Sequence, residues 1–235
     1  PWERPQALLL LNAAGTVPVM VENEGPAICG AGPIMEYLDE TRGYAVGDRR
    51  LMIPLDIAGP FADPALFAHP VVRAVTAALL GDDIVMGSCV AVTSYPGAAD
   101  QTMHFDQAAL FGDPAIDAAA PPHSITLVVP LVDLDDATGG TRFVPGSHRA
   151  PDSAADAVTP DLRAGDGLLF DSRILHGGLA NRSGAPRPIL YFTYHRAWYR
   201  DVTNFRDMPA MRIDRAALDA LPEAFRGWFA WAVRD

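Results

Sequence analysis

Short apolar runs separated by turn-forming residues dominate the middle of the chain. Runs rich in Val, Ile and Leu alternate with clusters such as Tyr95-Pro96-Gly97 and Gly139-Gly140. Short runs bounded by Gly and Pro are typical of β-strands. Many short strands joined by such turns predict a sandwich or a barrel. The expected strands are Ile84 to Ser94, Ile125 to Leu134, Thr141 to Val144, Gly167 to Phe170 and Ile189 to His195.

Helical spacing is found on the flanks of this region. The stretch Pro70 to Leu80 has apolar residues at helical intervals, and Gly81 ends the expected helix. A second helical stretch, Asp214 to Arg234, is interrupted at Pro222, and its aromatic stripe indicates core packing. Two Ala- and Asp-rich stretches predict loops of the kind that cover the mouth of a barrel. The expected loops are Asp113 to Pro122 and Arg149 to Pro160.

Residues 1–43 have a separate pattern. A β-rich run from Val17 to Glu22 and a second run near Ile28 precede an expected helix from Pro33 to Arg42. Pro at the first helical position and Gly after the last one support this helix. We therefore predict a small βα appendage over residues 1–43 and a main domain over residues 44–235. The whole chain is expected to be α+β and mainly β.

Composition and charge exclude several classes of function. The chain has 235 residues, of which 49% are hydrophobic and 20% are charged, which is ample for a globular core. Its formal net charge of −11 disfavours nucleic acid and membrane surfaces as partners. All 18 basic residues are Arg, so an enzyme that depends on a Schiff-base lysine or a Walker lysine is excluded.

The cysteines and the start of the chain bear on location. Cys29 and Cys89 are sixty residues apart, which fits neither a disulfide framework nor a zinc spacing, so a reducing cytoplasm is predicted. The early apolar run from Ala7 to Leu11 is too short to span a membrane. Because the chain begins with Pro1 rather than Met, we expect the natural sequence to extend upstream.

One histidine and one aspartate are spaced to bind a metal ion together. Asp106 follows His104 by two residues, and residues i and i+2 of an extended strand point to the same face. A second imidazole must come from elsewhere, and His176 lies shortly after the strand-like run that ends at Phe170. Two His and one carboxylate form the facial triad of non-haem Fe(II), which leaves three coordination positions open. Taken alone, a His-x-Asp pair is also common as surface residues.

Arg187 strengthens the metal-site hypothesis. It follows His176 by 11 residues, beyond the turn Asn181 to Gly184 and at the start of the next strand. An antiparallel return would place its guanidinium deeper in a barrel than His176, where it can grip a carboxylate through two parallel hydrogen bonds. A metal on one side and a fixed Arg on the other suit a short dicarboxylic keto acid. The alternative for a single Arg is a structural ion pair.

Three segments with these residues occur in a recognisable order and spacing over about Arg50 to Tyr199. They are Gln101-Thr102-Met103-His104-Phe105-Asp106, the stretch Gly139 to Arg149, and His176-Gly177-Gly178 with Asn181 and Arg187. Together they resemble the phytanoyl-CoA dioxygenase family of Fe(II)/2-oxoglutarate oxygenases. The resemblance implies a double-stranded β-helix, a cupin-like jelly roll, with flanking helices. It also implies His104, Asp106 and His176 as iron ligands and Arg187 as the residue that binds the distal carboxylate of 2-oxoglutarate.

The chain departs from the family pattern near the distal histidine. Many family members carry a hydroxyl residue two positions after that histidine, where this chain has Gly178. Thr126, Thr193 or Tyr191 is expected to substitute as a contact for the cosubstrate. By the same resemblance Gln101 contacts the cosubstrate or the substrate, and an exposed polar loop residue is the alternative for it. Asp106 is retained where halogenating relatives have a small residue, which disfavours halogenation.

The other histidines are assigned lesser roles. His148 is expected to hold a turn, and His69, before Pro70, is expected to cap a helix or lie on the surface. His195 is expected to line the mouth of the barrel, and His123 has no spacing argument.

The appendage resembles part of another family. Asn12 to Val21 followed by Ala31 to Glu40 is similar to the second half of a glutathione-transferase thioredoxin-like domain. That domain's first strand, first helix and catalytic group would lie upstream of Pro1, and Gly30-Ala31 replaces the usual Glu-Ser pair. We therefore expect no working glutathione site here.

The sequence thus predicts an Fe(II)- and 2-oxoglutarate-dependent dioxygenase that uses dioxygen as its second cosubstrate. It is expected to hydroxylate a small organic molecule, or to epimerise, desaturate or cyclise it, and a neutral molecule is favoured over a coenzyme A thioester. The alternatives are a non-catalytic binding protein, either a degenerate barrel or a glutathione-transferase-type module, and a manganese or zinc cupin. Neither the substrate nor the oligomeric state can be read from the sequence.

Overall fold

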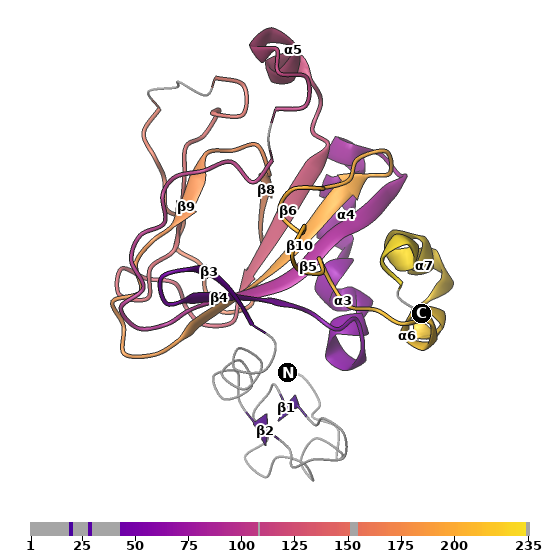
Figure 1. The fold of residues 1–235 in the computed structure, drawn as a ribbon, viewed down its shortest axis with the longest axis horizontal. Helices are drawn as coiled ribbons and strands as arrows, with labels where there is room; N and C mark the ends of the chain where they lie inside the picture. The colour runs from indigo at the N-terminus through magenta and orange to yellow at the C-terminus, as the bar shows by residue number, and fades with distance from the viewer. Residues whose placement is uncertain (1–18, 21–27, 30–42, 108, 151–154, 234–235) are drawn as a thin grey trace.

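A six-stranded antiparallel sheet forms the centre of the computed structural model, which describes residues 19–20, 28–29, 43–107, 109–150 and 155–233. The strand order is β3-β4-β5-β10-β6-β8 (Figure 1). Each neighbouring pair is antiparallel. The strands are β3 (Tyr44–Gly47), β4 (Arg50–Pro54), β5 (Ile84–Ser94), β6 (Ser124–Pro130), β8 (Leu168–Asp171) and β10 (Arg187–Arg196).

A second, smaller sheet lies beside β8. It consists of β7 (Thr141–Phe143) and β9 (His176–Gly178), paired antiparallel. Figure 1 shows β9 on the side of the molecule away from the helices. An isolated antiparallel bridge between His104 and His176 extends this sheet by one more segment. Two antiparallel sheets of this kind give the mainly β architecture that the sequence predicts.

The side chains of β10 alternate between two environments. Leu190, Phe192 and Tyr194 belong to a buried apolar cluster, whereas Tyr191 and Thr193 line a cavity on the other face. This alternation follows from the two-residue period of a strand. The pairing of β10 with β5 contains a register shift between Thr193 and Tyr194, because Thr193 pairs with Ser88 and Tyr194 pairs with Met86. The skipped residue is Gly87, so β5 has a β-bulge at this position.

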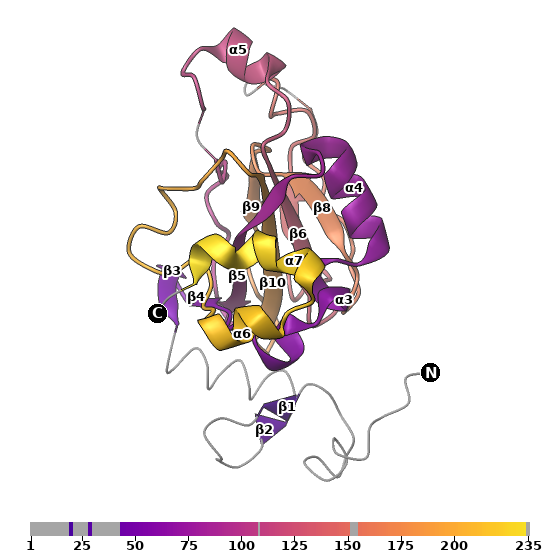
Figure 2. The same ribbon diagram turned by 90° about the vertical axis from the view of Figure 1, so that its right-hand side faces the viewer.

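Helices cover the outer face of the large sheet, as Figure 2 shows. The ring of Phe67 packs edge-on against Phe225, Trp228 and Phe229, with centroid distances of 5.2 to 6.3 Å. The Tyr194 hydroxyl reaches out of the sheet and donates to the Phe67 carbonyl oxygen at 2.6 Å. These contacts fix the helices on the sheet. The helices are α3 (Pro64–Phe67), α4 (Pro70–Leu80), α6 (Arg215–Ala220) and α7 (Glu223–Phe229), with short 3-10 turns at Gly59–Ala62 and Ala230–Ala232.

Several sequence predictions are confirmed. The helix Pro70–Leu80 ends at Gly81 as expected, and the C-terminal helical stretch is divided in two at Pro222. Strands β5, β7, β8 and β10 lie within a few residues of their predicted positions. Within the appendage the structure describes only β1 (Val19–Met20) and β2 (Ile28–Cys29), which pair antiparallel. The predicted helix at 33–42 and part of the loop 149–160 lie outside the described residues.

Other predictions are wrong in detail. The predicted loop 113–122 contains the helix α5 (Pro114–Ala119), because the Asp113 carboxylate caps it by accepting bonds from two backbone N–H groups and Pro114 suits its first turn. Strand β6 ends at Pro130 rather than at Leu134. The sequence analysis also missed the strand pair β3 and β4. Among the described residues, no helix has the length and apolar character needed to cross a membrane.

The packing of the C-terminal helix predicts a test of stability. Phe229 is fully buried, so Phe229→Ala is expected to lower the free energy of unfolding by about 3–5 kcal/mol in chemical denaturation. Val71→Ala is the control, because Val71 is 63% exposed on α4, and its effect should stay within about 0.5 kcal/mol. Equal losses in the two variants would show that α7 does not belong to the main core.

Candidate metal and cosubstrate site

Backbone hydrogen bonds bring the three predicted metal ligands together. The His104 N–H donates to the His176 carbonyl oxygen at 2.8 Å, and the His176 N–H donates to the His104 carbonyl oxygen at 2.9 Å. The two imidazoles consequently lie 4.6 Å apart, centre to centre. The Asp106 Oδ1 is 3.6 Å from the Nε2 of His104 and 3.5 Å from that of His176. All three ligand atoms lie within 4.8 Å of one another.

The other ring nitrogen of each histidine sets its orientation. The Nδ1 of His104 is 2.8 Å from the Thr102 carbonyl oxygen, and the Nδ1 of His176 is 2.9 Å from that of Ile174. A carbonyl only accepts, so each Nδ1 carries the proton, and the Nε2 of each neutral imidazole keeps a lone pair for a metal ion. The nearby Asp106 carboxylate, which can accept a hydrogen bond from a protonated Nε2, raises the pKa of His104. Two neutral imidazoles and one carboxylate, converging in this way, fit a divalent first-row metal ion.

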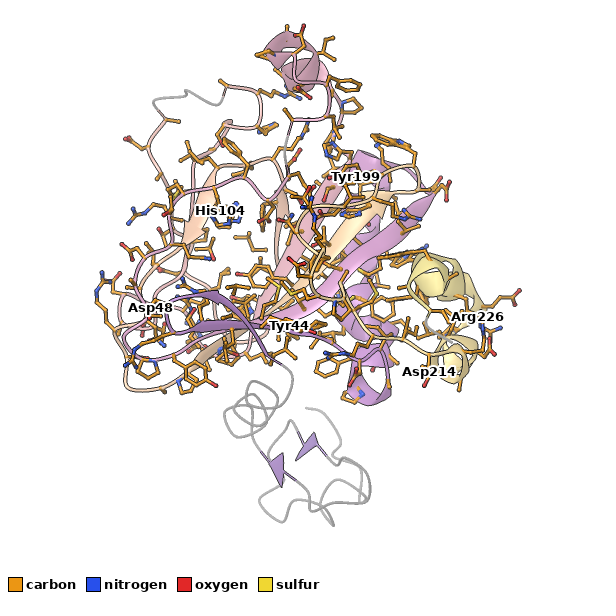
Figure 3. The ribbon with its side chains drawn as sticks, in the orientation of Figure 1. Tyr44, Asp48, His104, Tyr199, Asp214 and Arg226 are labelled. Carbon is orange, nitrogen blue, oxygen red and sulfur yellow. The ribbon has the colours of Figure 1, made fainter. Side chains whose placement is uncertain are left out.

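Exposure differs among the three ligands. The side chain of His176 is 7% exposed, whereas those of His104 and Asp106 are 40% and 33% exposed. Figure 3 shows His104 beside the small sheet. A metal ion held here would therefore be closed in on the His176 side and open on the side of the other two ligands.

Arg187 has an unused pair of donors. Its Nη1 donates to the carbonyl oxygens of Thr138 and Leu179, each at 3.0 Å, and its Nη2 donates to the Ser94 hydroxyl at 2.8 Å. The Nε has no hydrogen-bond partner among the described residues. A guanidinium has five N–H groups, so the Nε–H and one N–H of Nη2 remain, and these two share one edge. That edge can hold a carboxylate through two parallel hydrogen bonds.

A second buried guanidinium lies next to the first. Arg50 and Arg187 both pair with Ser94 in the sheet register, from its two sides. The Nε of Arg50 donates to the Ser94 hydroxyl at 2.8 Å, and its Nη2 donates to the Leu179 carbonyl oxygen at 3.3 Å. Burial and the nearby Arg50 charge lower the pKa of Arg187. Two adjacent buried cations favour an anion at this point, and sequence reasoning missed Arg50 because only the strand register brings it here.

Gln101 takes the space beside Gly178. The Gln101 Oε1 accepts a hydrogen bond from the Gly178 N–H at 2.9 Å, and a Cβ on Gly178 would come within 2.6 Å of that oxygen. The same Cβ would lie 3.6 Å from the Nη2 of Arg187. The Gln101 carboxamide therefore stands where a hydroxyl residue at position 178 would project, next to the free edge of the guanidinium.

Of the three hydroxyl residues expected to replace the one missing at Gly178, Tyr191 lies nearest to Arg187 along β10. It is on the same face, four residues away, and its hydroxyl is hydrogen-bonded to Thr141. Thr126 pairs with Thr193, which is six residues from Arg187. All three line the cavity, and Tyr191 is the one placed at the guanidinium end.

A cavity of about 300 Å³ lies between the large and the small sheet, and its lining includes Gln101 and Tyr191. It opens onto the three candidate metal ligands and continues along β10 as far as His195, so this histidine lines the cavity. His69 caps α4 as predicted, since its Nδ1 accepts from the Val71 N–H at 3.3 Å. His148 is not part of the metal-ligand cluster found among the described residues.

The family model described as phytanoyl-CoA dioxygenase matches residues 58–189, which is more than half of the chain. The chain belongs to the phytanoyl-CoA dioxygenase family. The family prediction made from the three sequence segments is thereby confirmed. A model of the glutathione S-transferase N-terminal domain matches residues 1–41, in agreement with the resemblance of the appendage.

Curated relatives of this family member include fungal dioxygenases. The dioxygenase aneA of Aspergillus aculeatus is 30% identical over 151 residues, which cover 60% of this chain and 51% of the relative. The Fe(II)/2-oxoglutarate-dependent dioxygenase nvfF of Aspergillus novofumigatus is 37% identical over 107 residues, or 40% of this chain and 35% of the relative. The chain therefore spans about half or less of the length of these two proteins.

Solved structures of similar fold confirm the predicted jelly roll. HygX from Streptomyces hygroscopicus, determined with nickel and 2-oxoglutarate bound, superposes with a TM-score of 0.56 at 14% identity, over 74% of this chain and 83% of that one. The α-ketoglutarate-dependent epimerase SnoN of nogalamycin biosynthesis superposes with a TM-score of 0.52 at 23% identity, over 72% and 74% of the two chains.

Two buried histidines that pack against Tyr199 make stability depend on pH. Burial lowers the pKa of His123 and of His195 from the usual 6.5 to about 4. The unfolded chain therefore binds more protons than the folded one between these values, and folding free energy is lost as the pH falls from about 6.5 through 4. We expect a loss of roughly 1–3 kcal/mol per histidine in denaturation series at pH 7 and pH 4.5.

His195→Gln tests this dependence. It should flatten the pH profile of the unfolding free energy, whereas His69→Gln, at an exposed helix end, should leave the profile unchanged. A profile that His195→Gln does not alter would contradict the assignment.

Proposed function

We propose that this protein is an Fe(II)- and 2-oxoglutarate-dependent oxygenase that uses dioxygen to oxidise a small organic molecule. One observation carries the proposal: the His104–Asp106–His176 cluster opens onto a cavity whose lining includes Gly178 and Tyr191, and a buried Arg187 lies beside these two residues with an Nε that has no partner among the described residues. The family membership and the names of the relatives support it. A non-catalytic binding protein would need neither the complete ligand set nor the free guanidinium edge.

The cosubstrate is proposed to span the distance between these two groups. Iron bound by the three ligands would supply the oxidation chemistry, and the keto acid end of 2-oxoglutarate would face it. The distal carboxylate would be held by Arg187, with Tyr191 and the Gln101 carboxamide as additional donors. We assign Thr126, on β6, to the cavity wall away from Arg187, since its partner Thr193 lies six residues from Arg187 on β10.

The chain's own residues favour hydroxylation over halogenation. Asp106 retains the carboxylate that a bound halide would have to replace, and its Oδ1 already lies close to both histidine Nε2 atoms. We therefore propose hydroxylation of an unactivated carbon, with epimerisation, desaturation or ring closure as the other outcomes of the same hydrogen removal. A cytoplasmic location is proposed from the spacing of the two cysteines.

Anaerobic titration with Fe(II) and 2-oxoglutarate tests the function directly. The unmutated protein is expected to develop the metal-to-ligand absorption band and, with oxygen and a substrate, to form succinate. His104→Ala removes one ligand and should abolish both signals. His69→Ala is the matched control, because His69 only caps a helix. Iron binding without any band or any 2-oxoglutarate consumption would contradict the proposal.

Arg187→Lys tests the anchor for the distal carboxylate. Lys keeps the charge but loses the two-donor edge, so the dissociation constant of 2-oxoglutarate should rise about tenfold or more in the same titration. Arg215→Lys, at an exposed position of α6, should leave the constant unchanged. An unchanged constant in Arg187→Lys would place the anchor elsewhere.

A further inference from the structure

A row of side-chain hydroxyls crosses the large sheet along the cavity. The Ser88 hydroxyl donates to that of Thr193 at 3.0 Å, which in turn lies 3.4 Å from that of Thr126. The row continues to Ser172 at 3.0 Å and to Ser124 at 2.8 Å. Four hydrogen bonds among five hydroxyls use four of their five protons. One O–H is therefore left to donate to another group.

The hydroxyl row lies away from the proposed cosubstrate anchor. Thr193 is on the same face of β10 as Arg187 but six residues farther along, which is about 20 Å at 3.3 Å per residue. Ser88, Thr126, Ser172 and Thr193 all line the cavity. The part of the cavity around Thr193 is thus lined by uncharged hydroxyls and lies well away from Arg187.

His195 provides an independent sign of a ligand at the hydroxyl end. It lines the same cavity, its side chain belongs to a residue that is 2% exposed, and neither ring nitrogen has a hydrogen-bond partner among the described residues. Its ring lies over Gly87, where a Cβ would come within 2.2 Å. A buried polar group without a partner costs about 1–3 kcal/mol, so a bound molecule that supplies one is favoured.

The charged groups at this end of the cavity are already hydrogen-bonded to other protein groups. Among the described residues no Arg lines the cavity, and the chain has no Lys. In the described part of the lining, Asp201 is the one carboxylate besides Asp106, and it accepts bonds from the Gln107 Nε2, the Asn204 Nδ2 and two backbone N–H groups. The rest of the lining includes apolar side chains, namely Val46, Met52, Val90, Val92, Phe105, Phe205 and Met208.

We propose that the cavity binds a neutral organic molecule that presents an alcohol or ketone oxygen to the hydroxyl row and lays a hydrocarbon skeleton against the apolar side chains of the lining. The substrate class is thus an uncharged, oxygenated hydrocarbon, and acids and acyl-coenzyme A thioesters are disfavoured at the hydroxyl row because the buried guanidinium of Arg187 lies six residues away from Thr193 along β10. This assignment rests on the proposed function in one respect, because it takes the bound molecule to be the substrate of the oxygenase.

Three probes, one neutral and two anionic, test the assignment. Ligand-detected NMR titrations of the full chain with 2-naphthol, 2-naphthoate and octanoyl-coenzyme A are expected to give binding of 2-naphthol at least about tenfold tighter than of the two anions. Thr193→Val removes the central hydroxyl at constant shape and should weaken 2-naphthol about tenfold. Ser88→Ala, at the end of the row, should act in the same direction if Thr193→Val does not fold.

Thr93→Val is the matched control. Thr93 is buried in the same sheet, its hydroxyl has no hydrogen-bond partner in the described part of the chain, and it is not among the residues that line the cavity, so this variant should bind 2-naphthol as the unmutated protein does. Equal binding of the anions, no binding of 2-naphthol, or no loss in Thr193→Val and Ser88→Ala would overturn the proposal. The 2-oxoglutarate titration should be unchanged in Thr193→Val. Since the probe titrations contain no 2-oxoglutarate, their failure is distinct from a failure of the proposed function.

Discussion

The pair of backbone hydrogen bonds between His104 and His176 holds the site together. The metal ligands come from two segments 72 residues apart, and this bridge fixes one segment against the other as in a short antiparallel ladder. Because both histidines use Nδ1 on a carbonyl of their own segment, the bridge also fixes their tautomers. The relative position of the two imidazoles is therefore set by the main chain.

The two faces of the large sheet have different roles. The outer face is apolar and carries the helices, so it supplies stability. The inner face carries, in sequence along β10, a guanidinium, a phenol, a hydroxyl and an imidazole at Arg187, Tyr191, Thr193 and His195. These polar groups are costly to bury, and the outer core around Phe67 offsets that cost. Strand β10 thus sets the spacing of the polar side chains along the cavity.

The sequence could predict the parts of the site that depend on local spacing. His104 and Asp106 are two residues apart, and Arg187 follows His176 by 11 residues, beyond the turn between β9 and β10, so local spacing sufficed. Arg50 was missed because it meets Arg187 only through strand register on either side of Ser94. The hydroxyl row was missed for the same reason, since Ser88 and Thr193 are 105 residues apart. The Asp113-Pro114 start of α5 is typical of a helix N-terminus, but the Ala- and Asp-rich composition of the segment led to the prediction of a loop.

The bulge at Gly87 decides which side chains the cavity receives. On β5, Met86 packs in the outer core, whereas Ser88 faces inward, so the extra residue reverses the alternation between them. The same glycine leaves room for the His195 ring. A gain or loss of one residue here would exchange the inward and outward sets of half a strand and leave His104, Asp106 and His176 untouched. The lining of the cavity can thus diverge at this one position independently of the His104–Asp106–His176 cluster.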